Sequence, residues 1–189
     1  MTTIQLSYNE VLTVARKAAG GAGLPHGVAE DVGEAAVWLS ARGVDAVSIV
    51  VDALGSPAEI LGAQAAIDAL CCGETAEIAA EGWNCRLMLI GLAGAVAAGT
   101  EMNLAVRKAG NVEPLARMVT AEALVPSVVG LLLLPFADDG APTPLRSHRP
   151  AATDAAAYAA ALGLAAKTYV PASELSRARG AGAGTTDND

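Results

Sequence analysis

The stretch "LSYNEVLTVARKAAGGAGLPHGVAEDVGEAAVWLSARG", residues 6–43, decides the N-terminal part of the fold because it predicts two consecutive helices. Ser7 followed three residues later by Glu10 is the pattern of a capping box, which marks the start of a helix. Apolar residues then recur at helical spacing, and the pair Gly20-Gly21 ends the pattern. These apolar positions are Val11, Leu12, Ala15, Ala18 and Ala19.

A second helix is predicted after the turn "GLPHG" (residues 23–27), because apolar residues again recur at helical spacing up to Gly43. The pair Ser56-Pro57 predicts the start of a third helix, with Ser56 as the N-cap and Pro57 at the first helical position. We therefore expect residues 1–73 to be mainly helical, with about three helices.

The rest of the chain, residues 74–189, breaks into short apolar runs that predict a mixed α/β portion. Two runs alternate, "AEIAAEG" (76–82) and "MNLAVRKAG" (102–110), and two are continuously apolar like buried strands, "CRLMLIG" (85–91) and "VVGLLLLPF" (128–136). Helix is an open alternative for the Ala-rich pieces, since short buried runs have no diagnostic period.

Near the C-terminus, "ADDGAPTPLRSHRP" (137–150) is rich in turn formers and predicts a surface loop. The stretch "ATDAAAYAAALGLAAKTYVP" (152–171) predicts a helix with Thr153 as its cap and an end near Lys167. The whole chain is therefore expected to form a single α+β domain, residues 1–189, with a helical N-terminal part packed on a β-containing body.

Composition narrows the classes of function. The chain is 53% hydrophobic but only 3% aromatic, so its core must be built from small side chains, and its charged fraction of 17% is low. Because small side chains bury little area each, we expect a homo-oligomer or a partner subunit. The net charge of −8 with 12 basic residues argues against binding to nucleic acid or to a membrane surface.

Cysteine and histidine usage indicates the compartment and the chemistry. An odd number of cysteines, 3, and the lack of a signal-peptide pattern predict a cytoplasmic protein. The 2 histidines are far apart and no metal-ligand spacing is present, so neither a metal nor another cofactor is predicted. The glycines of "GLAGAVAAG" (91–99) do not match a dinucleotide motif, which favours close packing as their role.

Individual candidates for chemistry each have a plainer alternative. His26 precedes Glu30 and Asp31, so it is either a proton-transfer residue held by a carboxylate or an exposed histidine near a helix start, and the second is favoured. His148, flanked by Arg146 and Arg149, forms either an anion site or a solvated loop. Cys85 begins an apolar run and is interpreted as a small core residue rather than a nucleophile.

The strongest candidate is the C-terminal stretch "KTYVPASELSRARGAGAGTTDND" (167–189). Alternating glycines allow the backbone to approach a ligand and to turn its N–H groups toward an anion, and arginine supplies the matching charge. A flexible, solvated tail is the alternative. The predicted ligand-binding residues are Tyr169, Arg177, Arg179, Gly180, Gly182, Gly184 and Asp187, and the predicted proton-handling residues are His26, Glu174 and Ser176.

The two ends of the chain together resemble a known group of proteins. The segments 6–43 and 169–189 are similar to an uncharacterised bacterial family whose members carry both, and this favours an ordered site at the C-terminus. The segment 23–45 is also faintly similar to the N-terminal helices of the type-2 malate/lactate dehydrogenase family. Where that family has an Asp-Ser-His-Gly catalytic segment, this chain reads "VDAVSIVV" (44–51) without histidine, so the resemblance implies no dehydrogenase activity here.

Two functions are therefore expected. The first is binding of a small anionic metabolite of the carboxylate type, with or without enzymatic activity, at the Ser/Arg/Gly-rich C-terminal segment. The second is the role of a non-catalytic accessory subunit or homo-oligomeric structural protein whose C-terminal segment docks into a partner.

Overall fold

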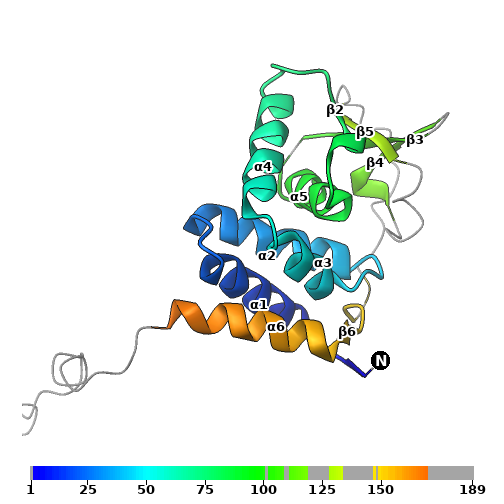
Figure 1. The fold of residues 1–189 in the computed structure, drawn as a ribbon. Coiled ribbons are helices and arrows are strands. Elements are labelled where there is room, and N and C mark those ends of the chain that lie inside the picture. The colour runs from blue at the N-terminus through cyan, green and yellow to red at the C-terminus, as the bar shows by residue number, and fades with distance from the viewer. Residues whose placement is uncertain are drawn as a thin grey trace, which may run out of the picture.

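The structure, a computed structural model, describes residues 2–100, 102–108, 111–118, 128–133, 147 and 149–169, and its fold class is the predicted α+β (Figure 1). The α-helices are α1 (Tyr8–Gly21), α2 (His26–Ser40), α3 (Ala46–Ala53), α4 (Pro57–Cys71), α5 (Arg86–Gly99) and α6 (Ala155–Ala165). The strands are β1 (Thr3–Ile4), β2 (Glu77–Ala79), β3 (Leu104–Lys108), β4 (Asn111–Pro114), β5 (Val128–Leu133) and β6 (Thr153–Asp154). Short 3₁₀ helices are η1 (Ala80–Gly82), η2 (Leu115–Arg117) and η3 (Ala166–Thr168).

The helices stack in a fixed order. In Figure 1, α1 lies between α6 and α2, and α2 in turn packs on α5. The four-stranded sheet lies beyond α5 and α4, at the end of the molecule away from α6. The helical layers and the sheet share one hydrophobic core, which runs from α1 through α5 to β3 and β5.

The predicted start of α1 is confirmed in detail. The Ser7 hydroxyl accepts a hydrogen bond from the Glu10 N–H at 3.3 Å, and the Ser7 N–H donates to the Glu10 carboxylate at 2.7 Å, which completes the capping box. The Ser7 N–H and the Ser7 hydroxyl, which donates to the same carboxylate at 2.8 Å, lower the pKa of Glu10. The buried face consists of Val11, Val14, Ala15, Ala18 and Ala19. Val14 was not among the predicted positions, and the predicted Leu12 is only partly buried.

Helix α3 lies in the N-terminal part in addition to the three helices that the sequence predicted. Its N-cap, Asp45, accepts hydrogen bonds from the Ser48 N–H at 3.3 Å and the Ser48 hydroxyl at 2.6 Å. The same carboxylate accepts the Asp154 N–H at 2.8 Å. Asp45 therefore both starts α3 and ties the beginning of α6 to it.

Residues 86–99 form helix α5, so the prediction of a buried strand at "CRLMLIG" is wrong. The helical alternative, left open for the Ala-rich pieces, holds for the rest of this segment, up to Gly99. Seven consecutive residues, 88–94, are buried because neighbours cover the helix on all sides. A Cβ atom on Gly94 would lie 2.2 Å from the Trp38 indole, and one on Gly91 would lie 2.8 Å from Leu39. Close packing is thus confirmed for these two glycines, but not for Gly99, which has no atom within 4 Å of that position.

The four-stranded sheet has the order β2-β5-β3-β4, and every pair is antiparallel. It confirms the strands predicted within 76–82, 102–110 and 128–136. Across the central strand, Arg107 of β3 forms an ion pair with Glu77 of β2 at 2.7 Å. Gly130 of β5 leaves the space for this crossing, since a Cβ atom there would lie 2.2 Å from the Glu77 carboxylate.

The predicted C-terminal helix is confirmed as α6, but its cap is Asp154 and not Thr153. The Asp154 carboxylate accepts the Ala156 N–H at 3.1 Å. Thr153 is buried and pairs with Ile4 in the two-stranded β1–β6 sheet, so its side chain lies one residue too early to cap the helix.

Among the described residues, no single helix is long and apolar enough to cross a membrane. Helices α3 and α4 reach the required length and composition only together, and they bend by 105° at the break between them.

Candidate functional site

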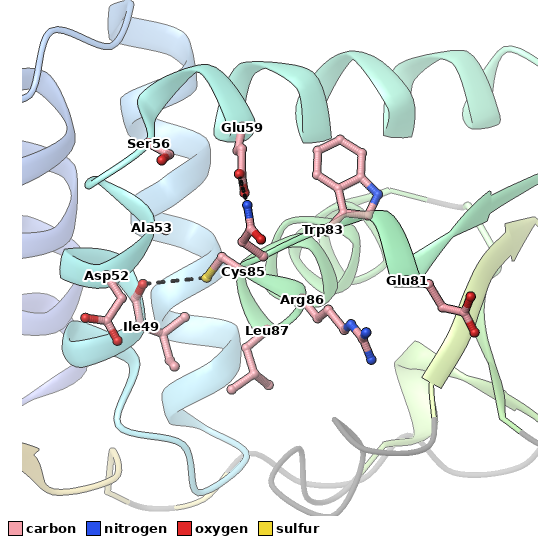
Figure 2. A pocket seen from close by; sticks show the side chains of 11 residues that line it. Ile49, Asp52, Ala53, Ser56, Glu59, Glu81, Trp83, Cys85, Arg86 and Leu87 are labelled. Atoms are coloured by element: carbon pink, nitrogen blue, oxygen red, sulfur yellow. Dashed lines mark hydrogen bonds between the residues drawn. The ribbon is translucent and has the colours of Figure 1, made fainter.

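A cleft with a volume of about 770 Å³ lies between the end of α3, the start of α4 and the start of α5 (Figure 2). Polar and charged side chains share it with an indole and aliphatic side chains. The lining residues are Ile49, Asp52, Ala53, Ser56, Glu59, Glu81, Trp83, Asn84, Cys85, Arg86 and Leu87. We call this the Trp83 cleft.

Local sequence explains how each wall is placed. Pro57 starts α4 directly after the turn at residues 54–56, and this puts Glu59 in the first turn of the helix. The Trp83 indole lies beside Gly62 of the same helix, at an ordinary van der Waals distance of 3.5 Å from the position of a Cβ atom there. The Asn84 amide donates a hydrogen bond to the Glu59 carboxylate and joins the segment before α5 to α4.

Cys85 lies at the centre of the cleft, where it is the N-cap residue of α5. The prediction that it is a core residue is confirmed in part, because the side chain is half-buried and packs against the core while also lining the cleft. Its thiol lies 3.9 Å from the Ile49 carbonyl oxygen, to which it donates. Burial raises the pKa of Cys85, and the charges of Asp52 and Glu59 raise it further. The thiol is therefore protonated at neutral pH, the opposite of an activated nucleophile.

The charges around the cleft are unequal. Three carboxylates, of Asp52, Glu59 and Glu81, line it together with a single guanidinium, that of Arg86. Within the part of the chain that the structure describes, none of the four takes part in an ion pair. In the same part, no group of three or more His, Cys, Asp or Glu residues is arranged to hold a metal ion.

The two predicted site residues that the structure describes lie outside the cleft. His26 is the first residue of α2, its side chain is 86% exposed, and its Nδ1 lies 3.6 Å from the Glu30 carboxylate. This is the exposed arrangement that the sequence favoured. Tyr169 is 62% exposed and follows η3, where the Lys17 ammonium donates to its hydroxyl at 3.4 Å and lies 5.2 Å from the ring centroid.

The other predicted site residues lie outside the described part of the chain. They are Glu174, Ser176, Arg177, Arg179, Gly180, Gly182, Gly184 and Asp187. Of the predicted basic triplet, Arg146 and His148 also lie outside it, while Arg149 is described and exposed.

Sequence reasoning did not find most of the Trp83 cleft. One signal was present, the run "EGWNCR" (81–86), which places an acid, an indole, an amide, a thiol and a guanidinium just before an apolar helix. Asp52 and Glu59 carry no such signal, because they reach the cleft only through the bend between α3 and α4.

Comparison with known proteins gives one match. No curated protein and no solved structure is significantly similar to this chain. Residues 6–80 match the model of a family described as a protein of unknown function (DUF3726). The match confirms the predicted resemblance to an uncharacterised family for segment 6–43 but does not extend to segment 169–189. It includes the α3 and α4 walls of the Trp83 cleft. Over these residues, from α1 to β2, the chain is therefore similar to the DUF3726 family.

Proposed function

We propose that this protein binds a small metabolite that carries a carboxylate, and that Arg86 in the Trp83 cleft is the anchor for this group. The observation that carries the proposal is that Arg86, a half-buried residue, lines a cleft of about 770 Å³ and has no ion pair among the described residues. Ligand pockets typically measure about 300–1,000 Å³ and combine apolar walls with a few polar groups.

The start of α5 adds to the attraction for an anion. Arg86 is the first residue of this 14-residue helix, and Cys85, Arg86 and Leu87 all line the cleft. The N–H groups of a first helical turn have no partner within the helix and carry partial positive charge. A carboxylate beside Arg86 would accept hydrogen bonds from the planar guanidinium fork, which matches its two oxygens.

The proposal concerns binding in the cytoplasm, and catalysis is not part of it. All three cysteines, Cys71, Cys72 and Cys85, are free thiols, which supports a reducing compartment. The prediction that Arg177, Arg179 and the glycines after them bind an anion remains a prediction, since these residues lie outside the described part of the chain.

Titration calorimetry with a panel of small carboxylic acids and their methyl esters tests the proposal. We expect some acids to bind and their esters to bind at least about tenfold more weakly, because the ester lacks the charge that pairs with Arg86. Arg86→Gln should remove binding of the acids. Lys167→Gln is the matched control, since it removes one positive charge from the exposed η3 segment, away from the cleft. Equal affinity of the wild type and Arg86→Gln for every acid that binds would contradict the proposal, as would binding of no acid at all.

Self-association is a second candidate function, and one observation favours it. Helix α6 contains no charged residue, and only Ala161 and Ala165 among its residues are buried. Leu162 on its outer side is 47% exposed. An exposed helix face without charges is typical of a surface that another chain covers.

Size-exclusion chromatography with light scattering tests this second candidate. If α6 forms the interface, Leu162→Glu should lower the molar mass of the assembly to that of the monomer, because the interface would then bury an unpaired charge. Ala58→Glu places the same charge in the exposed first turn of α4 and should leave the mass unchanged. A wild-type protein that is already a monomer at high concentration would rule out the α6 interface.

A further inference from the structure

We infer that the metabolite bound in the Trp83 cleft carries an amine as well as a carboxylate, with an apolar chain between the two groups. This inference rests on the proposed function and specifies the chemical class of its ligand.

The Trp83 cleft has an excess of negative charge. Asp52, Glu59 and Glu81 contribute three negative charges against one positive charge from Arg86. A ligand with a carboxylate alone would add a fourth negative charge. Two like charges 4 Å apart repel by about 1 kcal/mol in bulk water and by about 4 kcal/mol near a protein surface. A simple anion is therefore a poor match for this cleft, and a ligand with a compensating cation is a better one.

The Asp52 and Arg86 charges lie on opposite sides of Cys85. In the view of Figure 2, the Asp52 carboxylate and the Arg86 guanidinium point away from Cys85 in opposite directions. In the same view Glu59 lies above Cys85, where the Asn84 amide donates to its carboxylate, and Glu81 lies on the Arg86 side. The charges of Asp52 and Glu59 also raise the pKa of Cys85, which places their combined negative potential at the centre of the cleft. An ammonium group near Cys85, between Asp52 and Glu59, would meet this potential while a carboxylate contacts Arg86.

Apolar side chains line the same cleft as the charged groups. Ile49, Trp83 and Leu87 are half-buried and line the same cleft. Methylene groups that bind against these side chains leave water at about 25 cal/mol per Å² of apolar area. The Trp83 indole adds a face that attracts cations. The cleft thus offers carboxylates, apolar side chains and a guanidinium to one ligand.

Titration calorimetry with straight-chain probes of matched length tests the inference. The probes are the ω-amino acids from glycine to 6-aminohexanoate, the n-alkylamines and the alkanoates of the same chain lengths. We expect at least one ω-amino acid to bind about tenfold more tightly than both probes of its length that have one charged group. Asp52→Asn should weaken the ω-amino acid about tenfold and strengthen the alkanoate, because it removes one carboxylate.

The matched control is Asp68→Asn, which removes one negative charge from the exposed far part of α4, outside the cleft. It should leave all affinities unchanged. If alkanoates bind as tightly as ω-amino acids and Arg86→Gln weakens both, the inference fails while the proposed function stands. If Asp52→Asn leaves the affinity for the ω-amino acid unchanged, the inference fails in the same way. If no probe with a carboxylate binds, both fail.

Discussion

Helices α5 and α6 are both rich in alanine and leucine but lie in opposite environments. Neither has an acidic residue in its first turn. Residues 88–94 of α5 are all buried, whereas α6 buries only Ala161 and Ala165. The glycines of the two helices differ in the same way. A Cβ atom on Gly94 would clash with Trp38, whereas a Cβ atom on Gly163 would have no other atom of the described residues within 4 Å. Similar sequences thus serve as a central core element and as an outer layer, depending on what packs around them.

The contact between Gly94 and Trp38 tests most directly how tightly α5 is packed. Gly94→Ala would place a methyl group 2.2 Å from the indole of Trp38, which is only 4% exposed and is stacked by Arg42 with its Cζ 3.7 Å from the ring centroid. Because the ring has little room to move, we expect a loss of about 1–3 kcal/mol in the free energy of unfolding. Urea denaturation measures it. A stability equal to that of the wild type would show that α5 is less tightly held than its burial indicates.

The docking of α6 depends on a different glycine, Gly21 at the end of α1. A Cβ atom on Gly21 would lie 1.9 Å from the Leu164 carbonyl oxygen, which belongs to the α6 backbone and so has no side-chain rotation to relieve the clash. We expect Gly21→Ala to push α6 away from α1, with faster amide exchange over 155–165 and little change in α5. Gly20→Ala is the matched control, because its nearest contact is an ordinary 3.6 Å to Thr168. Equal exchange rates in the two variants would contradict this account of α6.

Substitution of Gly163 in α6 should have the opposite sign to that of Gly94. Alanine is the better helix former by about 0.5–1 kcal/mol, and the position is open in the described structure. Gly163→Ala should therefore raise the free energy of unfolding by about that amount in urea denaturation. If the variant is instead destabilised, and more so at high protein concentration, a second chain packs closely on this face, which would support the α6 interface.

The pH dependence of thermal stability should change least of all, and the change comes from Cys85 at the start of α5. This side chain is half-buried and has no charged hydrogen-bond partner among the described residues. Its pKa is raised by burial, so the folded state binds the thiol proton more tightly than the unfolded state does. The resulting stability is fully present below the ordinary thiol pKa of about 8.5 and is lost as the pH rises through the folded value. Between about pH 7 and pH 10, the wild type should lose slightly more thermal stability than Cys85→Ser. The same pH dependence in both proteins would contradict a buried, protonated thiol.

Much of the fold could be predicted because its signals are local. The capping box at Ser7 and Glu10, the Ser56-Pro57 start and the alternation in residues 102–110 each act over a few residues. Helix α5 was mistaken for a strand because it is apolar on all sides, which removes the period that distinguishes a helix. The cap of α6 was misplaced by one residue, since Thr153 and Asp154 are both good cap types and only the pairing of Thr153 with Ile4 separates them.

The Trp83 cleft could not be predicted in the same way. Its charged groups come from three segments, at Asp52, Glu59 and residues 81–86, and they meet because α3 and α4 bend by 105°. One part of the cleft is visible in the sequence, the run "EGWNCR" around Trp83. This run lines a cleft only because α3 and α4 lie opposite it.

The α+β class, the starts of α1 and α4, the strands β2, β3 and β5, and a core of small side chains all follow from the sequence alone. Each of these follows from interactions between residues close in the chain or from composition alone. The tertiary structure decided which Ala-rich helix is buried, which glycines are contact points, and that Arg86 shares a cleft with Asp52 and Glu59. These features depend on packing between distant segments, where the free energy comes from the neighbours that a residue meets and not from its own type.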